Sequence, residues 1–439
     1  MPTHAEACRP PDLDQPPAGG GHAPQGFADV WNAGIGGFLL ELAGGSIYRA
    51  RMDNLDHRQR PDSVNLSRDA LQVPHVTADG REDNAAEWVA ALLRTSGPAR
   101  KALYMSADRV RRERMGDGVF LRGIVEFSNI CGRDCHYCGI RSSNRDVRRY
   151  RMDADEILAV AKNMVGWKQT TIVLQSGEAA SPEGDRRLGD LIRRIKAETD
   201  LSVTMSVGNR PRDVYSHWRD CGMDRYLLRF ETSDPALFAQ IHPACTLGER
   251  LECLHILRSL GVQVGSGFMI GVPGETPEVL AANILLCRNL DLDMIGIGPF
   301  IPHPCTPLGK TANAYAADPE MHFVALAALR LANPDAHIPA TTAFDAVFTN
   351  PSGRDLALQR GANVFMPNST PGQYRKDYML YPDKPCVDEN GALCAFCIVG
   401  RLEMLGRQIG TGPGHSRKRG DRGVPASPIA PAAAGSGRP

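Results

Sequence analysis

Residues 121–138 read LRGIVEFSNICGRDCHYC. The first part, Leu121–Phe127, is rich in apolar and β-branched residues, which is typical of a buried β-strand. Three cysteines follow, Cys131, Cys135 and Cys138, in the spacing C-x3-C-x2-C. In a parallel α/β barrel, chemistry belongs on loops at the carboxyl ends of strands, and the three thiols directly follow this candidate strand.

Outward from this strand, apolar runs alternate with amphipathic segments. The further strand candidates are Thr171–Gln175, Ser202–Val207, Arg225–Phe230, Gln263–Ile270, Met294–Phe300, Ile338–Thr342 and Asn363–Met366. Helices are predicted between them, with starts marked by Asp153 and Glu156 as a capping box and by Thr276 before Pro277. Eight strands with helical crossovers over about 250 residues predict an α/β fold, a complete (β/α)8 barrel of TIM type. A doubly wound open sheet is the alternative.

The two ends of the chain differ from this core in composition. Residues 1–83 are rich in Pro, Gly, Asp and Arg and are predicted to form a mostly irregular extension. Residues 84–117 carry an N-terminal helical segment, and the barrel is predicted over residues 118–409. Residues 410–439 are of low complexity and are predicted to be a disordered tail. The basic run Arg417–Arg419 in this tail is expected to be solvated rather than bound to an acidic partner.

Composition restricts the class of protein. The 50 basic and 50 acidic residues give no net charge, so no global field attracts nucleic acid or a membrane surface. No stretch reaches the roughly 18 to 20 apolar residues of a membrane helix, and the N-terminus lacks the pattern of a secretory signal. Six of the twelve cysteines fall into two local clusters, which favours metal binding over a secreted disulfide scaffold. We therefore expect a cytoplasmic protein.

The first cysteine cluster suits an iron–sulfur centre. Three thiolates are one ligand short of a closed zinc site, so a zinc knuckle would need His136, whose adjacency to Cys135 makes the geometry awkward. On a 4Fe-4S cluster, three cysteines leave one iron without a protein ligand. An amine and a carboxylate, such as those of S-adenosylmethionine (SAM), can chelate that iron.

This spacing, with the aromatic Tyr137 before the third cysteine, resembles the radical-SAM superfamily. Longer runs resemble its HydE family, the maturases of iron–iron hydrogenase, which is related to biotin synthase and to the pyrrolysine-pathway mutase. The runs are LRGIVEFSNICGRDCHYCGIRSSN, YRMDADEI, TIVLQSGE, DRYLLRFET, GFMIGVPGET, MIGIGPFIPHPCTP, IPATTA and ANVFMPNSTP. The resemblance covers about residues 85 to 408 and implies a complete barrel with the cluster and SAM at its C-terminal mouth.

The resemblance also assigns roles to individual residues. Cys131, Cys135 and Cys138 are expected to hold the 4Fe-4S cluster, with Tyr137 beside it. Glu231 and Arg250 match residues that bind the methionine end of SAM; without the resemblance they would be interpreted as a surface or inter-loop ion pair. The positions expected to line the inner cavity are Gln175, Ser176, Thr204, Met269, Thr341 and Thr342.

A second cluster, Cys386, Cys394 and Cys397, has the spacing C-x7-C-x2-C. Some members of the family carry an auxiliary iron–sulfur cluster at these places, which is often 2Fe-2S. We expect iron–sulfur binding here, and the alternative is a labile or zinc-filled site of little catalytic weight.

The function implied by the resemblance is the cleavage of SAM to a 5′-deoxyadenosyl radical that acts on a small-molecule substrate. That substrate is an iron–carbonyl–cyanide cysteine adduct supplied by HydG, and the product passes to the scaffold HydF. Reduced ferredoxin or flavodoxin is the expected electron donor. One alternative is a HydE-like or biotin-synthase-like enzyme that acts on an organic thiol or amino acid. A second is a non-enzymatic iron–sulfur or zinc-binding protein.

Overall fold

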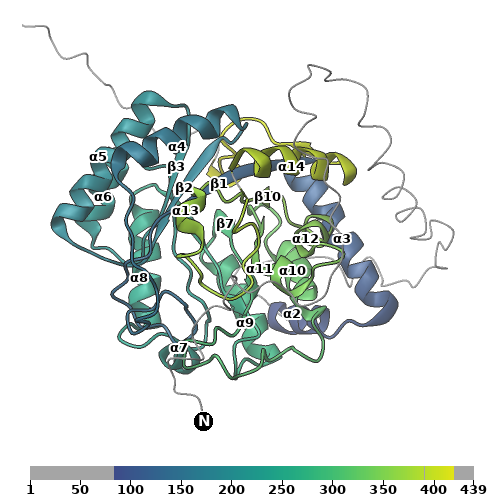
Figure 1. Cartoon of the computed structure of the whole chain (residues 1–439). Helices are drawn as coiled ribbons and strands as arrows, with labels where there is room; N and C mark the ends of the chain where they lie inside the picture. Colours follow the sequence, from purple (N-terminus) through teal and green to yellow (C-terminus); the bar gives the residue numbers. More distant parts are fainter. Residues whose placement is uncertain (1–83, 390, 420–439) are drawn as a thin grey trace, which may run out of the picture. The chain divides into compact units, whose positions relative to one another are not determined.

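Eight parallel strands form a barrel with helices around it in the computed structural model, which describes residues 84–389 and 391–419 without the side chains of residues 393, 394 and 396 (Figure 1). The predicted extension over residues 1–83 lies outside the described residues. The barrel strands are β1 Gly118–Ser128, β2 Thr171–Ser176, β3 Ser202–Ser206, β4 Arg225–Leu227, β5 Gln263–Ser266, β7 Met294–Ile295, β9 Pro339–Ala340 and β10 Val364–Phe365.

The strands pair in a ring. Each strand from β1 to β5 pairs with the next, β5 pairs with β7, and β10 lies between β9 and β1. A parallel bridge between Met294 and His337 joins β7 to the residues before β9, and so completes the circle. The predicted (β/α)8 barrel is therefore confirmed, and the open sheet is not formed.

Two barrel strands continue after a break. β6 (Met269–Ile270) extends β5, β8 (Gly298–Pro299) extends β7, and β6 pairs with β8. Gly267 lies at the first break with φ of 149°, and a Cβ there would lie 1.9 Å from the carbonyl oxygen of Gly296. Glycine at position 267 is thus required for the two strands to approach each other near the carboxyl end of the barrel.

The helices begin where the cap signals predicted. Asp153 accepts a hydrogen bond from the backbone N–H of Glu156 at the start of α4, and Thr276 accepts from Val279 at the start of α9. The capping box at Asp153 is only half formed, because the Glu156 carboxylate accepts from Tyr374 instead. The larger helices are α2 Ala85–Leu93, α3 Gly97–Met115, α4 Ala154–Gly166, α5 Pro182–Glu198, α6 Arg212–Asp220, α8 Leu247–Ser259, α9 Pro277–Asn289, α10 Met321–Ala332 and α14 Gly391–Met404.

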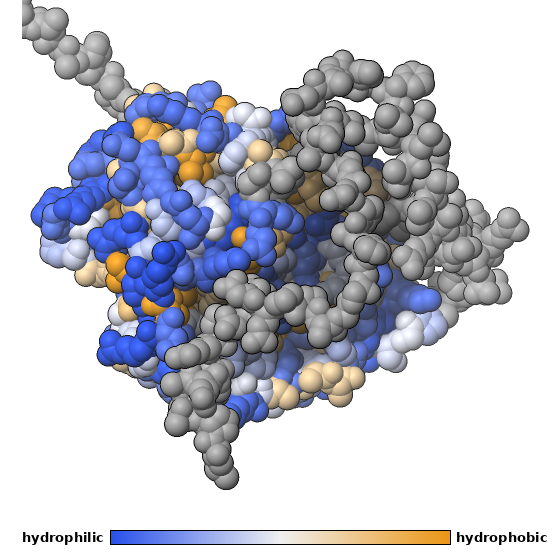
Figure 2. All heavy atoms as spheres, viewed as in Figure 1, coloured by the Kyte–Doolittle hydropathy of each residue, from blue (hydrophilic) through white to orange (hydrophobic). Residues whose placement is uncertain are grey.

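Short helices connect the remaining elements: α7 Pro235–Ile241, α11 Ala343–Val347, α12 Gly353–Gln359 and α13 Gly372–Arg375. Figure 2 shows that the visible described surface is mostly hydrophilic, with apolar side chains in small patches. The apolar side chains gather instead between the helices and the barrel and inside it, as with the buried Val125, Leu174 and Met205. Among the described residues, no helix combines the length and the apolar character needed to cross a membrane.

Residues 410–419 differ from the predicted disordered tail, whose remaining part, residues 420–439, lies outside the described residues. β11 (Gln408–Ile409) pairs with the start of β1, and the following residues lie against the amino ends of the strands. The carbonyl oxygens of Pro413 and Gly414 accept hydrogen bonds from Arg225 at 2.6 Å and from Arg122 at 2.9 Å. This segment thus supplies hydrogen-bond acceptors to two buried guanidinium groups of the barrel. The need of these buried groups for acceptors cannot be seen in the composition of the segment itself.

The basic run at residues 417–419 is not simply solvated. It forms a short 3-10 helix whose Lys418 ammonium lies 3.0 Å from Asp291. Arg419 lies 2.6 Å from Asp291 and 3.0 Å from Asp293. The acidic partners of Lys418 and Arg419 are therefore Asp291 and Asp293, which lie between α9 and β7 of the same chain.

Candidate functional site

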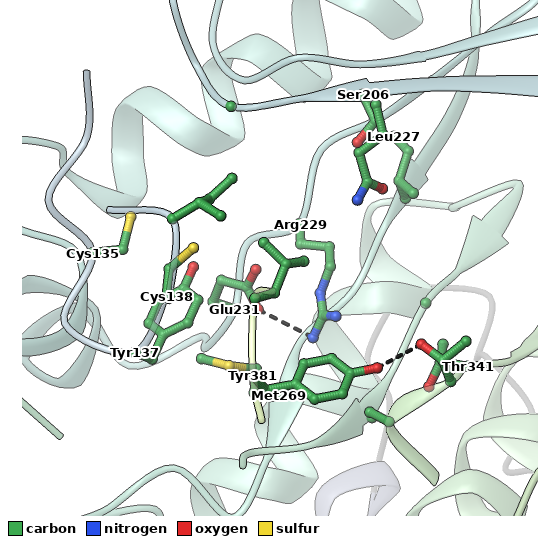
Figure 3. Close-up of a pocket in the computed structure, with 18 of the residues that line it drawn as sticks. Cys135, Tyr137, Cys138, Ser206, Leu227, Arg229, Glu231, Met269, Thr341 and Tyr381 are labelled. Carbon is green, nitrogen blue, oxygen red and sulfur yellow. Dashed lines mark hydrogen bonds and ion pairs between the residues drawn. The ribbon is translucent and has the colours of Figure 1, made fainter. Parts of the chain in front are cut away.

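A cavity of about 340 Å³ opens at the carboxyl ends of the barrel strands. Its wall is built from loops that follow different strands, so residues far apart in the sequence face one another (Figure 3). The sequence-predicted residues that line it are Cys131, Cys135, Tyr137, Cys138, Gln175, Ser176, Glu231, Arg250, Met269, Thr341 and Thr342.

The cysteine loop is fastened to its neighbours through its backbone. The N–H of Gly132 donates to the carbonyl oxygen of Glu178 at 2.8 Å, and that of His136 donates to Ile241 at 2.9 Å. A Cβ on Gly177 would lie 2.4 Å from the carbonyl oxygen of Ile130, so the loop after β2 fits directly beneath the cysteine loop. These contacts hold three thiols at the mouth of the barrel. His136, the fourth ligand of the zinc alternative, does not line the cavity.

The three thiols are free, and Cys135 is buried. Burial raises the pKa of Cys138 to about 12, with the neighbouring Cys131 thiol adding to the rise and Arg149 opposing it. Burial and the two other cysteines raise the pKa of Cys135 in the same direction. A cationic metal centre would offset both effects, since thiols deprotonate on binding metal.

Within the described ranges, no three His, Cys, Asp or Glu side chains converge on one metal ion. A 4Fe-4S cluster has a different requirement, because each thiolate binds a separate iron.

Glu231 has a strained backbone. Its φ is 64°, a left-handed conformation that is uncommon for residues with a side chain. Hydrogen bonds hold it there, because its N–H donates to Gly267 at 3.0 Å and its carbonyl oxygen accepts from Met269 at 3.1 Å. Its Oε2 forms an ion pair with Nη2 of Arg229 at 3.1 Å, and this buried oxygen has no hydrogen-bond partner among the described residues. Figure 3 shows both side chains between the cysteine loop and Thr341.

Arg250 enters the cavity from α8 and is 5% exposed. Its Nη2 lies 2.9 Å from Nε2 of His242, while its buried Nε has no hydrogen-bond partner within the described part of the chain. Burial, with the charge of Arg250 beside it, lowers the pKa of His242 to about 3. His242 is therefore neutral at physiological pH and accepts the hydrogen bond from Arg250.

Uncharged polar side chains line the side of the cavity away from the cysteines. The hydroxyls of Thr342 and Tyr381 lie 2.6 Å apart, and Thr341 donates to the carbonyl oxygen of Ile297. Gln175 Nε2 donates to the Tyr378 hydroxyl at 3.4 Å. These groups can bind a polar ligand and keep it in one orientation.

The cavity also contains residues that sequence reasoning missed: Glu126, Glu178, Ser206, Arg229, His242, Tyr378, Tyr381 and Lys384. Arg229 and Ser206 are the next-to-last residues of predicted strands, so strand position could have identified them. Lys384 and Glu126 form a buried ion pair, with side-chain exposures of 5% and 4%. No local pattern marks this pair, because its members are 258 residues apart.

Thr204 does not reach the cavity. It lies in the middle of β3, and it lines a separate small pocket with Arg122 and Arg225. The residue of β3 that lines the cavity is Ser206, at the carboxyl end of the strand. The resemblance placed Thr204 near the end of its strand, whereas two further residues of β3 separate it from the cavity.

Of the second set of cysteines, Cys386 and Cys397 are not part of this cavity wall. Cys386 has φ of 64°, its thiol lies 3.6 Å from Nη2 of Arg354, and its carbonyl oxygen accepts from Arg375 at 2.7 Å. Cys397 is exposed on α14, and the side chain of Cys394 lies outside the described atoms. An auxiliary cluster at these cysteines stays a prediction.

Comparison with known proteins agrees with this geometry. Residues 125–286 match the model of the radical SAM superfamily. The chain is 44% identical over 319 residues to the [FeFe] hydrogenase maturase subunit HydE of Thermotoga maritima. The aligned region covers 73% of this chain and 89% of that protein.

More distant relatives carry out other reactions. The chain is 32% identical over 278 residues to the biotin synthase of Anaeromyxobacter sp. (strain K), covering 62% of this chain and 75% of that protein. Among solved structures, methylornithine synthase (PylB) superposes with a TM-score of 0.63 at 24% identity, over 74% of this chain and 94% of that one. This last likeness concerns the fold alone.

Proposed function

The chain belongs to the HydE family of the radical SAM superfamily, and on that premise we propose that it acts on an iron–carbonyl–cyanide cysteine adduct during assembly of the di-iron centre of [FeFe] hydrogenase. Membership implies a 4Fe-4S cluster and SAM as cofactors. When bound, they supply a one-electron cleavage of SAM that yields a 5′-deoxyadenosyl radical. The chain's own residues have to bind these groups, orient them and exclude water.

Cys131, Cys135 and Cys138 are the proposed ligands of the cluster. The observation that carries the proposal is that three free thiols of one loop line the same cavity as Glu231 and Arg250. Three thiolates leave one iron free for a chelating cosubstrate. The position of the loop at the carboxyl ends of the strands agrees with where such barrels carry out their reactions.

Arg250 and Glu231 are the proposed partners of the methionine end of SAM. Each has a buried polar atom without a hydrogen-bond partner, Nε in Arg250 and Oε2 in Glu231. The carboxylate of such a ligand would accept hydrogen bonds from the guanidinium of Arg250, and its ammonium would donate to the carboxylate of Glu231. Both would be charge-assisted hydrogen bonds. Tyr137 and Met269 belong to one apolar cluster beside them and would pack against the less polar parts of SAM.

The uncharged polar side of the cavity is the proposed substrate side. Gln175, Thr341 and Thr342 offer amide and hydroxyl groups there, and Ser176 adds a hydroxyl nearer to the cysteine loop. Arg229 adds a cation that forms an ion pair with Glu231 and whose Nε and Nη2 have no hydrogen-bond partner among the described residues. Such groups suit a small anionic or carboxylate-bearing substrate. Tyr381, bonded to Thr342, helps to keep this side closed against water.

The proposed chemistry also requires other proteins. A HydG-type maturase would supply the iron-containing substrate, and a HydF-type scaffold would receive the product. Reduced ferredoxin or flavodoxin is the proposed electron donor, and an auxiliary 2Fe-2S cluster at Cys386, Cys394 and Cys397 is a further part of the proposal.

Anaerobic reconstitution with iron, sulfide, SAM and dithionite tests the proposal. We expect 5′-deoxyadenosine to form, and its formation to increase when the synthetic iron–carbonyl–cyanide cysteine adduct is added. In Cys135→Ser, with two of three thiolates left, we expect at least about a 1,000-fold loss, since the group that carries the chemistry is removed. Cys287→Ser, which changes a buried cysteine outside the cavity, is the control. The proposal would be refuted if neither the unchanged protein nor Cys287→Ser formed 5′-deoxyadenosine.

A second candidate is an organic thiol or amino acid as the substrate, which the likeness to biotin synthase favours. The two candidates differ in what increases SAM cleavage. If cysteine-like thiols accelerate 5′-deoxyadenosine formation and the iron adduct does not, the second candidate replaces the first while the radical SAM chemistry stands.

A further inference from the structure

Arg149 lies at the base of the cysteine loop, and its side-chain hydrogen bonds within the described residues all go to main-chain carbonyl oxygens. Nη1 donates to the carbonyl oxygens of Asn129 at 2.7 Å and Ile140 at 2.8 Å. Nη2 donates to those of Arg141 at 2.6 Å and Asn144 at 3.1 Å. Asn129 precedes the first cysteine of the loop and Ile140 follows the last. One nitrogen atom of Arg149 therefore holds the two ends of the loop together.

The backbone of Arg149 is itself held in place. Ser128 and Arg151 form an antiparallel bridge, and the Ser128 hydroxyl donates to the carbonyl oxygen of Tyr150 at 2.9 Å. The N–H of Tyr150 donates to Oδ1 of Asn129 at 2.8 Å, and its hydroxyl donates to the carbonyl oxygen of Glu126. The segment that carries Arg149 is thus attached to the end of β1, next to the point where the cysteine loop begins.

Only an arginine suits this position. Four carbonyl oxygens converge on one point, and a guanidinium offers five donors in a fixed planar fork, whereas a lysine offers three on a flexible stem. Convergent carbonyl oxygens also create a negative potential, which would oppose the addition of an electron to a nearby iron–sulfur centre. The charge of the guanidinium offsets that potential.

We propose that Arg149 is a positioning residue for the cluster, which closes the cysteine loop before the cluster is bound and makes the bound cluster easier to reduce. This rests on the proposed function, because it takes the cysteine loop to be the cluster site. Arg149 touches no substrate in this role. It acts through the backbone of the loop and through its charge.

Hydrogen–deuterium exchange of the full-length apoprotein tests the first half of the proposal. In Arg149→Gln, backbone amides of residues 129–144 should exchange at least about tenfold faster, because hydrogen bonds from a charged donor are lost. Arg149→Lys should lie between this variant and the unchanged protein. Arg145→Gln, an exposed arginine of the same segment, is the matched control and should change nothing. Equal exchange in all four proteins would overturn the proposal.

A redox titration of the reconstituted cluster, followed by electron paramagnetic resonance, tests the second half. In Arg149→Gln, the ratio of reduced to oxidised cluster at a fixed potential should fall about tenfold, which is about 59 mV for one electron. Arg149→Lys keeps the charge, so its potential should stay close to that of the unchanged protein. If the potential is the same in Arg149→Gln, the electrostatic role is overturned and a purely structural clamp is left.

The two proposals fail in different ways. If the unchanged protein binds no cluster, the proposed function fails, whereas the exchange measurement on the apoprotein still judges the loop-closing role of Arg149. If the unchanged protein binds a cluster and the glutamine variant matches it in both measurements, only the role of Arg149 fails. Melting temperatures of all four proteins identify a variant that does not fold, in which case Arg149→Lys carries the exchange test.

Discussion

Glu275 is a buried carboxyl group whose hydrogen-bond partners are both neutral. Its Oε2 accepts from the backbone N–H of Gly271 at 2.6 Å, and its Oε1 accepts from Asn283 at 3.0 Å. Burial raises its pKa to about 8, because no cation compensates for the lost hydration, and the two hydrogen bonds oppose this rise only in part. In the unfolded chain the same group titrates near 4.5. The folded protein therefore binds a proton here over a pH range in which the unfolded chain does not.

This difference predicts a stability that falls with rising pH. The contribution of Glu275 is fully present below pH 4.5 and is lost as the pH rises to about 8. In Glu275→Gln, which cannot titrate, the free energy of unfolding should decline less between pH 5 and pH 8, by a few kcal/mol at most. Urea denaturation at pH 5 and at pH 8 measures this decline in the free energy of unfolding. Glu278→Gln, exposed in the first turn of α9, is the control, and an equal decline in all proteins would contradict the prediction.

Residues of the candidate site could be found from the sequence to the extent that each belongs to a local pattern. Cys131, Cys135 and Cys138 stand in one motif, and Glu231 and Arg250 were reached only through longer runs that resemble a family. Tyr378, Tyr381 and Lys384 could not be found in this way. They come from an irregular loop after β10, and their place in the cavity depends on barrel closure rather than on their neighbours in the chain.

At the scale of elements, strands and helix starts follow from short-range signals. The apolar run at 171–175 and the Thr276–Pro277 cap each occupy a few residues, and both elements formed where predicted. The segment 410–419 was predicted wrongly because its partners are distant: Arg122 and Arg225 on the barrel strands, and Asp291 after α9. Its own composition is that of a disordered tail. Only the tertiary structure shows that Arg122 and Arg225 take hydrogen-bond acceptors from it.

Removal of this segment should destabilise the barrel. A chain that ends at Ile409 leaves two buried guanidinium groups without the carbonyl oxygens of Pro413 and Gly414. Each unsatisfied charged group costs about 1–3 kcal/mol or more, so we expect a loss of the order of 5 kcal/mol in the free energy of unfolding. Urea denaturation compares the chain that ends at Ile409 with one that ends at Arg419 and keeps every described contact. If the two truncated chains unfold at the same urea concentration, the segment contributes no stability.

At the scale of the whole molecule, contacts between distant parts of the chain close the barrel. The ion pair of Lys384 with Glu126 connects the loop after β10 to the first strand. Lys384 also donates to the carbonyl oxygen of Tyr378 at 3.1 Å, so the pair fixes the loop that forms one wall of the cavity. Both charges are almost fully buried, and neither can be left alone without a large cost.

Breaking this pair should therefore cost more than breaking an exposed one. We expect Lys384→Met to lose about 3–5 kcal/mol of stability, because Glu126 is left as an unpaired buried charge. The double variant Lys384→Met with Glu126→Gln should recover more than half of that loss. Lys376→Met is the matched control, since Lys376 pairs with Asp388 at an exposed position and should lose at most about 1 kcal/mol. Thermal and urea unfolding measure all three, and equal losses in the two single variants would refute the argument.

The pairing of β1 has a consequence for synthesis of the protein on the ribosome. β1 bears the cysteine loop, and its neighbours are β2 on one side and β10 and β11 on the other. Of these, β10 and β11 are translated last, more than two hundred residues after the cysteines. In a nascent chain, one edge of β1 therefore stays unpaired until β10 has been translated. The barrel can therefore close around the loop that carries the three thiols only after β10 has been synthesised and has reached β1.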